Sequence, residues 1–423
     1  MKKILLLTFL YFSLFHMAIF GQDIPNYDLP ELLVSNDGTV ISNSEAWENT
    51  RRPEIIALFE NSVYGKIPEM ELDISYKLVK IDKDALDGKA IQKEVIATFS
   101  NGKESLEMNM LIFLPKNTKK PVPVFLGMNF YGNHTIHSDS NITITPSYVK
   151  NNEEFSITNN KATELSRGVR SHRWPIEQIL RRGYGVVSIY YGDIDPDFDD
   201  DFQNGIHKLF NSINEKPAPD AWGSIATWAY GLSKAMDYLV TDNDIDKNKV
   251  AVIGHSRLGK TALWAGAMDK RFAITISNDS GCGGAALSRR KQGETVKQIN
   301  TSFPHWFCKN FHEYNDKEED LPVDQHMLIA LIAPRPVYVA SASEDQWADP
   351  KGEYLSLYYS GIVYNLFGLE YFSSNTMPAL NQSQTFGNMG YHIRSGKHDL
   401  TLFDWEKYMD FADVQFNYSS DEY

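Results

Sequence analysis

The residues Gly254 to Thr261 carry the strongest chemical signal in the sequence, because they fit two unrelated catalytic motifs. The run reads Gly-His-Ser-Arg-Leu-Gly-Lys-Thr. As G-x-S it predicts a nucleophile elbow, in which Ser256 occupies a sharp turn between a strand and a helix. As G-x-x-x-x-G-K-[ST] it predicts the phosphate-binding P-loop of a nucleotide enzyme. Since both motifs join a strand to a helix, the local pattern is typical of either.

The elbow interpretation requires an acid and a histidine further along the chain, in that order. The apolar segment 336–341 predicts a strand, and Asp345 follows it closely. His398 lies in a polar loop before a helix expected at 402–411. This order predicts that His398 takes the proton from the serine. His392 is the competitor, but it lies in a more strand-like stretch.

The first 21 residues have the pattern of a secretory signal peptide. Lys2 and Lys3 precede an almost wholly apolar run, and Gly21 offers a small residue for cleavage. We therefore expect a mature chain of residues 22–423 that is periplasmic or secreted. The alternative is a membrane anchor, but no basic cluster follows Gly21, and no other long apolar run suggests a membrane segment.

The charge of the chain bears on its partners. The net charge is −14, and loss of Lys2 and Lys3 makes it more negative by two. Such a surface argues against nucleic-acid binding. For a P-loop, Asp279 at the end of the apolar segment 272–279 could hold magnesium, but nucleotide triphosphates are scarce outside the cytoplasm. There is no H-E-x-x-H and no Cys/His cluster, so no catalytic zinc is suggested.

The two cysteines, Cys282 and Cys308, are expected to form a disulfide, because an oxidising compartment favours the bridge. Two buried free thiols are the alternative. The sequence carries no information on oligomeric state, and a monomer is the default expectation.

The order of predicted strands indicates the fold class. Alternating segments at 72–81, 91–99 and 106–114 come first, the last two joined by the hairpin signal Asn101-Gly102. Continuous apolar runs and helical stretches follow, which is typical of a parallel sheet. We expect an α/β fold of the α/β-hydrolase type in one catalytic domain, with runs at 121–127, 184–191, 250–254, 272–277 and 336–341 and a long helix at 222–240.

Two polar stretches are expected to lie at the surface. Residues 137–166 are rich in Asn, Ser and Thr and predict a long insertion. Asp193 to Asp201 resembles a calcium loop, but it lacks the glycine and glutamate that an EF-hand requires. We interpret it as a solvated acidic loop.

Gly254 to Lys260 resembles the G-C-S-R-x-G-K signature of glucuronoyl esterases, carbohydrate esterase family 15, with His255 in place of the usual cysteine. Further matching segments extend the resemblance over most of the mature chain, and bacterial members fit best. They include Gly127–Asn133, Arg173–Pro175, Ser280–Gly284, Gly293–Thr295 and Glu344–Pro350.

The resemblance implies a metal-independent serine esterase without a cofactor. Its substrate would be the ester between 4-O-methyl-glucuronic acid of glucuronoxylan and an alcohol of lignin. Ser256 would be the nucleophile, His398 the base and Arg257 an oxyanion donor. The sugar would be held by Lys260, Glu294 and Trp347.

The acidic member of the triad is left open between two residues. The family's usual acid follows the strand after the elbow, where Asp279 stands, one methylene shorter than the usual glutamate. Asp345, after the later strand, is slightly favoured. The rival functions are an acetyl-xylan or other carbohydrate esterase with the same triad, a carbohydrate-binding relative without activity, and, more remotely, the P-loop enzyme.

Overall fold

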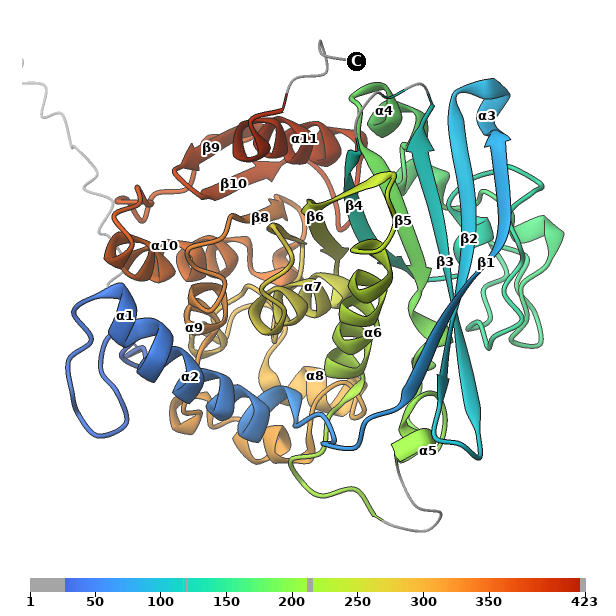
Figure 1. The fold of residues 1–423 in the computed structure, drawn as a ribbon. Helices are drawn as coiled ribbons and strands as arrows, with labels where there is room; N and C mark the ends of the chain where they lie inside the picture. Colours follow the sequence, from blue (N-terminus) through green and yellow to red (C-terminus); the bar gives the residue numbers. More distant parts are fainter. Residues whose placement is uncertain (1–26, 117, 119–120, 211–215, 419–423) are drawn as a thin grey trace, which may run out of the picture.

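A ten-stranded sheet forms the centre of the molecule (Figure 1). The computed structural model describes residues 27–116, 118, 121–210 and 216–418, so the expected signal peptide lies outside the described residues. The strand order is β1-β2-β3-β5-β4-β6-β7-β8-β10-β9. The strands are β1 Asp73–Asp84, β2 Ala90–Ser100, β3 Ser105–Pro115, β4 Val122–Asn129, β5 Gly185–Tyr190, β6 Ile245–His255, β7 Ile274–Asn278, β8 Val337–Ala342, β9 Gln382–Phe386 and β10 Met389–Arg394.

The six strands from β5 to β10 in this order run parallel, as the continuous apolar runs predict. Successive residues of β6 point to opposite faces: Val250 and Val252 belong to one buried cluster, and Ala251 and Ile253 belong to the other. Both faces are covered, which is why these strands show no polar alternation. The carboxyl ends of β6, β7 and β8 therefore meet at one edge, where Ser256, Asp279 and Asp345 follow.

Helices cover the two faces of the sheet (Figure 1). Side chains of α6, α7, α9 and α10 belong to the larger cluster, whereas those of α4 and α11 belong to the smaller one. The bounds are α1 Ser44–Ala46, α2 Arg52–Phe59, α3 Ala85–Gly88, α4 Ile176–Arg181, α5 His207–Phe210, α6 Ser224–Leu239, α7 Arg257–Met268, α8 Val296–Ser302, α9 Gln325–Ala330, α10 Pro350–Leu366 and α11 Leu402–Phe416. No helix of the described residues is long and apolar enough to cross a membrane.

The antiparallel strands β1, β2 and β3 extend the sheet beyond β5. Asn101 and Gly102 form the turn between β2 and β3, and Gly102 has a φ of +83°. The predicted hairpin is therefore confirmed.

The acidic stretch Asp193 to Asp201 is not a solvated loop throughout, and that interpretation is wrong for its first half. Asp193, Asp195 and Asp197 are buried and hydrogen-bonded. Asp193 accepts from Ser147 of the insertion, at 2.7 Å. This contact fixes the 137–166 segment to the body of the protein, and the burial raises the pKa of Asp193 to about 6.

The expected disulfide is also wrong, because Cys282 and Cys308 are both free and buried. The Cys308 Sγ contacts the carbonyl of Asn61 at 3.9 Å, near the N-terminal helices. Cys282 instead lies in the charged surroundings of Lys260 and Glu294. Burial raises the pKa of both thiols, that of Cys308 to about 11.

Candidate active site

Ser256 sits on a strained turn between β6 and α7, as the elbow interpretation predicts. Its φ is +59° and its ψ is −131°, a conformation that non-glycine residues rarely adopt. The helix begins at the next residue, Arg257, so its first N–H groups, which lack intrahelical acceptors, lie beside the serine. Only Ser256 separates the end of β6 at His255 from the start of α7 at Arg257, so there is no loop here that could surround a phosphate. The P-loop interpretation is therefore wrong.

The glycines of the motif explain its departure from G-x-S-x-G. A Cβ on Gly254 would lie 1.8 Å from the carbonyl oxygen of Leu258, so the turn requires glycine there. A Cβ on Gly259 would lie 2.9 Å from the Cβ of Ser280. The helix therefore approaches Ser280 most closely at Gly259, one residue later than in G-x-S-x-G. The preceding residue, Leu258, is buried in the core.

One cleft of about 370 Å³ brings all eight candidate residues together. It lies at the carboxyl ends of the parallel strands, where α/β folds place their ligand sites. Its lining includes two residues that were not singled out from the sequence, Phe303 and Trp306. The eight candidates are Ser256, Arg257, Lys260, Asp279, Glu294, Asp345, Trp347 and His398.

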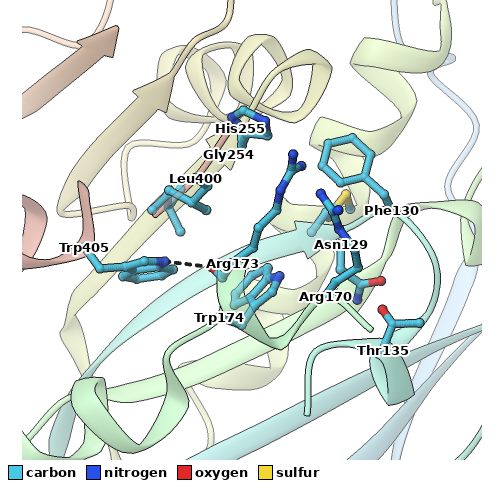
Figure 2. A pocket seen from close by; sticks show the side chains of 12 residues that line it. Asn129, Phe130, Thr135, Arg170, Arg173, Trp174, Gly254, His255, Leu400 and Trp405 are labelled. Atoms are coloured by element: carbon cyan, nitrogen blue, oxygen red, sulfur yellow. Dashed lines mark hydrogen bonds between the residues drawn. The ribbon is translucent and has the colours of Figure 1, made fainter. Parts of the chain in front are cut away.

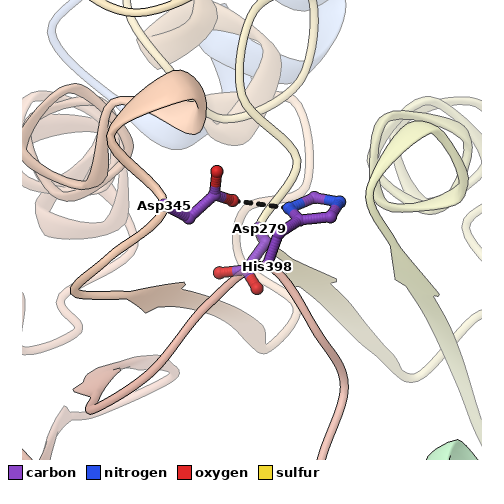
Figure 3. Close-up of side chains that lie close together, drawn as sticks. All are labelled: Asp279, Asp345 and His398. Carbon is purple, nitrogen blue, oxygen red and sulfur yellow. Dashed lines mark hydrogen bonds and ion pairs between the residues drawn. The ribbon is translucent and has the colours of Figure 1, made fainter.

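His398 is held by Asp345 (Figure 3). Its Nδ1 lies 2.5 Å from Oδ2 of Asp345, which is buried, whereas the imidazole remains 41% exposed. A carboxylate on Nδ1 favours the tautomer whose Nε2 accepts a proton. The competitor, His392, is fully buried and bonded to Asp404 and Tyr338, away from the cleft.

Asp279 lies beside this pair without an equally short contact. Its ligand atom, that of Asp345 and that of His398 lie within 4.8 Å of one another, a spacing that would also suit a cation. One Asp279 oxygen accepts from Arg394 at 3.4 Å, and the other has no partner among the described residues. Burial, reinforced by the charge of Glu353, raises the pKa of Asp279 well above its usual range.

Arg394 fixes the loop that carries His398. Its guanidinium donates to the carbonyls of Lys397, at 3.0 Å, and Asp399, at 2.5 Å. It is itself anchored by the buried Asp404 at 2.8 Å. The loop backbone on both sides of His398 is thus tied to the end of β10.

Arg257 lies under aromatic rings and against a buried carboxylate. Its guanidinium carbon is 4.6 Å from the ring centre of Trp306 and 5.4 Å from that of Phe303. One nitrogen pairs with Asp197, which also accepts from His305 at 2.9 Å. Burial opposes the charged form of Arg257, but Asp197 outweighs it and raises the pKa. The Nε is buried and makes no hydrogen bond to any described residue.

Lys260, Glu294 and Trp347 form the far wall of the cleft. The buried Lys260 donates to the carbonyl of Ser280. Among nearby charges, that of Glu294 does most to favour the charged form of Lys260. Burial lowers the pKa of Lys260 and raises the pKa of Glu294. Trp347 is 53% exposed, although it is a large aromatic. A half-exposed indole beside a buried lysine and a partly buried glutamate suits a sugar ring.

His255 lies next to His398 and lines a small cavity shown in Figure 2. Its ring centre is 4.5 Å from that of His398, and its Nδ1 bonds to Asn278 at 2.6 Å. Figure 2 shows the side chain of Arg173 reaching toward His255 and Phe130. Burial, then the charge of Arg173, holds the pKa of His255 far below its usual range, so its imidazole is neutral.

Comparison with known proteins decides the family. A carbohydrate esterase of an unknown prokaryotic organism, MZ0003, is 54% identical over 391 residues, which cover 92% of this chain and 90% of the relative. The chain belongs to carbohydrate esterase family 15, the glucuronoyl esterases. The sequence model of fungal glucuronyl esterases matches residues 183–368. The chain is accordingly a carboxylic ester hydrolase with the α/β-hydrolase fold.

Two solved structures of this family are similar throughout. A family 15 esterase from a marine bacterial metagenome, described as promiscuous, is 53% identical with a TM-score of 0.87, covering 93% of this chain and 98% of that one. A glucuronoyl esterase from Solibacter usitatus is 44% identical with a TM-score of 0.86, covering 93% and 99%.

The residues around Arg257 are what the sequence did not reveal. Asp197, Phe303 and Trp306 lie about 50 to 60 residues from it in the chain, and no motif marks them. The only sequence feature that drew attention to Asp197 was the excess of acidic residues around it. That excess predicted a solvent-exposed loop, not a partner for Arg257.

Proposed function

We propose that this protein hydrolyses esters of glucuronic or 4-O-methyl-glucuronic acid in glucuronoxylan, including those with alcohols of lignin. The observation that carries the proposal is that one cleft contains an elbow serine, a carboxylate-bound histidine, an arginine paired with a carboxylate, and the side chains of Lys260, Glu294 and Trp347. Family membership supports the uronate as the acyl group.

The mechanism begins with Ser256. His398 removes the hydroxyl proton while the oxygen attacks the uronate carbonyl, and Asp345 stabilises the resulting imidazolium. Arg257 stabilises the tetrahedral oxyanion, through its backbone N–H at the start of α7 and through its side chain. The pairing of the Arg257 guanidinium with Asp197, which fixes its position beside the cleft, supports that role. His398 then protonates the departing alcohol, and a water activated by the same imidazole releases the acid.

The sugar ring is held opposite the nucleophile. Trp347 stacks on the pyranose face, while Lys260 and Glu294 hydrogen-bond its hydroxyls. Because Lys260 is buried and Glu294 is partly buried, their polar groups are poorly solvated when the site is unfilled. A substrate whose hydroxyls pair with these groups therefore binds more tightly than one that lacks them.

The location of the enzyme follows from its first residues. We infer that residues 1–21 are removed on export and that residues 22–423 act as one catalytic domain and a monomer, periplasmic or secreted. Intact mass after export from a bacterial host should match a chain beginning at Gln22. A mass that includes residues 1–21 would contradict cleavage.

The test of function compares two esters. Wild-type enzyme should cleave benzyl glucuronate and leave an acetylated xylo-oligosaccharide nearly untouched. Release of acetate alone would move the enzyme to another esterase class while keeping its triad.

A broader carbohydrate esterase is the second candidate. It is favoured by the solved relative described as promiscuous. Under this alternative both esters are cleaved at comparable rates, and Trp347→Ala lowers only the glucuronate activity.

A further inference from the structure

His255 is a buried residue beside the catalytic histidine that has no role in the mechanism above. It is the last residue of β6 and directly precedes Ser256, and only 3% of it is exposed. It does not line the catalytic cleft, so it is not placed to touch the substrate. The signature that this segment resembles has a cysteine at this position, and a cysteine has no aromatic ring. The ring is therefore a feature of this chain that the signature does not explain.

The ring of His255 lies against the ring of His398. Their centres are 4.5 Å apart, and their planes make an angle of 40°. The distance is at the short end of the range for aromatic pairs, and the angle is far from the perpendicular, edge-on arrangement. Asp345 contacts the edge of the His398 ring, at Nδ1. His255 is thus placed to act on a face of the catalytic imidazole, while Asp345 acts on its edge.

Hydrogen bonds fix the orientation of the His255 ring. Its Nδ1 lies 2.6 Å from Oδ1 of Asn278, which is its neighbour on β7 in the sheet. The Nδ2 of Asn278 donates to the hydroxyl of Tyr408 at 2.9 Å, so the amide oxygen is the atom that faces His255. An oxygen accepts, and Nδ1 of His255 therefore carries the proton while its Nε2 carries none.

His255 stays uncharged when His398 takes up a proton. The Nε2 of His255 is buried and has no partner among the described residues, so a proton there would create a buried charge without an acceptor. Arg173, whose side chain reaches toward the ring in Figure 2, also opposes a positive charge on it. Burial, then this charge, holds the pKa of His255 far below its usual range. What the ring offers to His398 is thus the partial negative charge of an aromatic face.

We propose that His255 is a positioning residue for the catalytic histidine: its neutral ring supports one face of His398 and stabilises the imidazolium that forms when Ser256 gives up its proton. The inference rests on the proposed function. An aromatic face attracts a cation, and more strongly where water is excluded. Because the imidazolium is present in the transition state and not in the bound ground state, the effect belongs to kcat rather than to substrate binding.

Two variants separate the ring face from the hydrogen bond. His255→Phe keeps an aromatic ring and loses the bond to Asn278, whereas His255→Asn keeps an amide that can donate to Asn278 and has no ring. On benzyl glucuronate, His255→Asn should lose roughly tenfold in kcat, and His255→Phe should stay within about threefold of wild type. The KM of both variants should stay within about twofold of wild type, since His255 does not line the cleft.

The control is His137→Asn, the same substitution at a partly buried histidine outside the linings of the cleft and of the small cavity. It should change neither kcat nor KM. The unfolding temperature shows whether each variant is folded, and His255→Leu, which also lacks a ring, replaces His255→Asn if the latter does not fold.

Three results would overturn the role of the ring. They are equal losses of kcat in the Phe variant and the variant without a ring, a loss in His255→Phe alone, and a loss that appears in KM. A loss in His255→Phe alone would assign the role to the hydrogen bond with Asn278 instead. If wild type does not cleave the ester, the proposed function itself fails and this inference fails with it, a result distinct from the other three.

Discussion

Arg257 is the residue whose role the geometry constrains most closely. Its pairing with Asp197 and its place under Trp306 hold it rigidly, and a preorganised donor is what stabilises an oxyanion. Arg257→Ala should lower kcat on benzyl glucuronate by roughly 100-fold or more, a loss of about 3–4 kcal/mol. Arg181→Ala, on the surface of α4, is the control. Near-normal turnover of Arg257→Ala would remove the side chain from the mechanism.

The assignment of Asp345 as the acid of the triad is a prediction at the same scale. Asp345 makes the 2.5 Å contact with His398, whereas Asp279 makes only 3.4 Å contacts elsewhere. Asp345→Asn should therefore lower kcat by roughly 10³- to 10⁴-fold through loss of the correct tautomer. Asp279→Asn should cost about tenfold or less. The reverse order of losses, measured on the same ester, would assign the role to Asp279.

The helix α10 connects the elements that bear the acids. Its Glu353 accepts from the N–H of Ser280 at 2.7 Å, after β7, and from Ser341 at 2.6 Å, at the end of β8. Burial raises the pKa of Glu353 to about 7. The carboxyl therefore keeps its proton in the folded protein at pH values where the unfolded chain has lost it.

The resulting dependence of stability on pH has a definite sign. The contribution is fully present below about pH 4.5 and is lost as the pH rises through about 7, by up to about 3 kcal/mol. The free energy of unfolding should thus fall between pH 5 and pH 8 in wild type, and less so in Glu353→Gln. Glu406→Gln, an exposed carboxylate on α11, should behave as wild type. Parallel curves for all three proteins would refute the assignment.

The sequence predicted those elements whose residue pattern is typical of only one kind of secondary structure. Parallel strands such as β6 and β8 are buried on both faces, so their apolar runs are visible without knowledge of their neighbours. The helix α10 was not predicted, because buried residues such as Gly352, Glu353 and Ser356 interrupt any apolar stripe. The burial of Asp197 could not be predicted either, since its partners, Arg257, His305 and Trp306, are distant in the chain.

At the scale of the whole molecule, the reactivity of the two cysteine thiols reports on how the chain is packed. Each thiol is buried in a different neighbourhood, Cys308 near Asn61 and Cys282 near Lys260. Protein purified without reductant should release two titratable thiols after denaturation and almost none before it. Absence of thiols in the denatured protein would mean that a bridge forms and that this region is rearranged.

The whole molecule is organised so that one sheet edge gathers residues from distant parts of the chain. Ser256 follows β6, Asp345 follows β8, and His398 follows β10, so the reaction needs all three strands in register. Activity should therefore be lost together with global unfolding, not before it.

Turnover of benzyl glucuronate by wild type and Ser256→Ala tests the proposed esterase most directly. The serine is intermediate in exposure and forms no part of the core, so its replacement should leave the fold intact. Wild type should hydrolyse the ester, and the variant should lose roughly 10⁴-fold or more in kcat while unfolding at the same temperature. A folded Ser256→Ala protein with substantial turnover would contradict nucleophilic catalysis at the elbow.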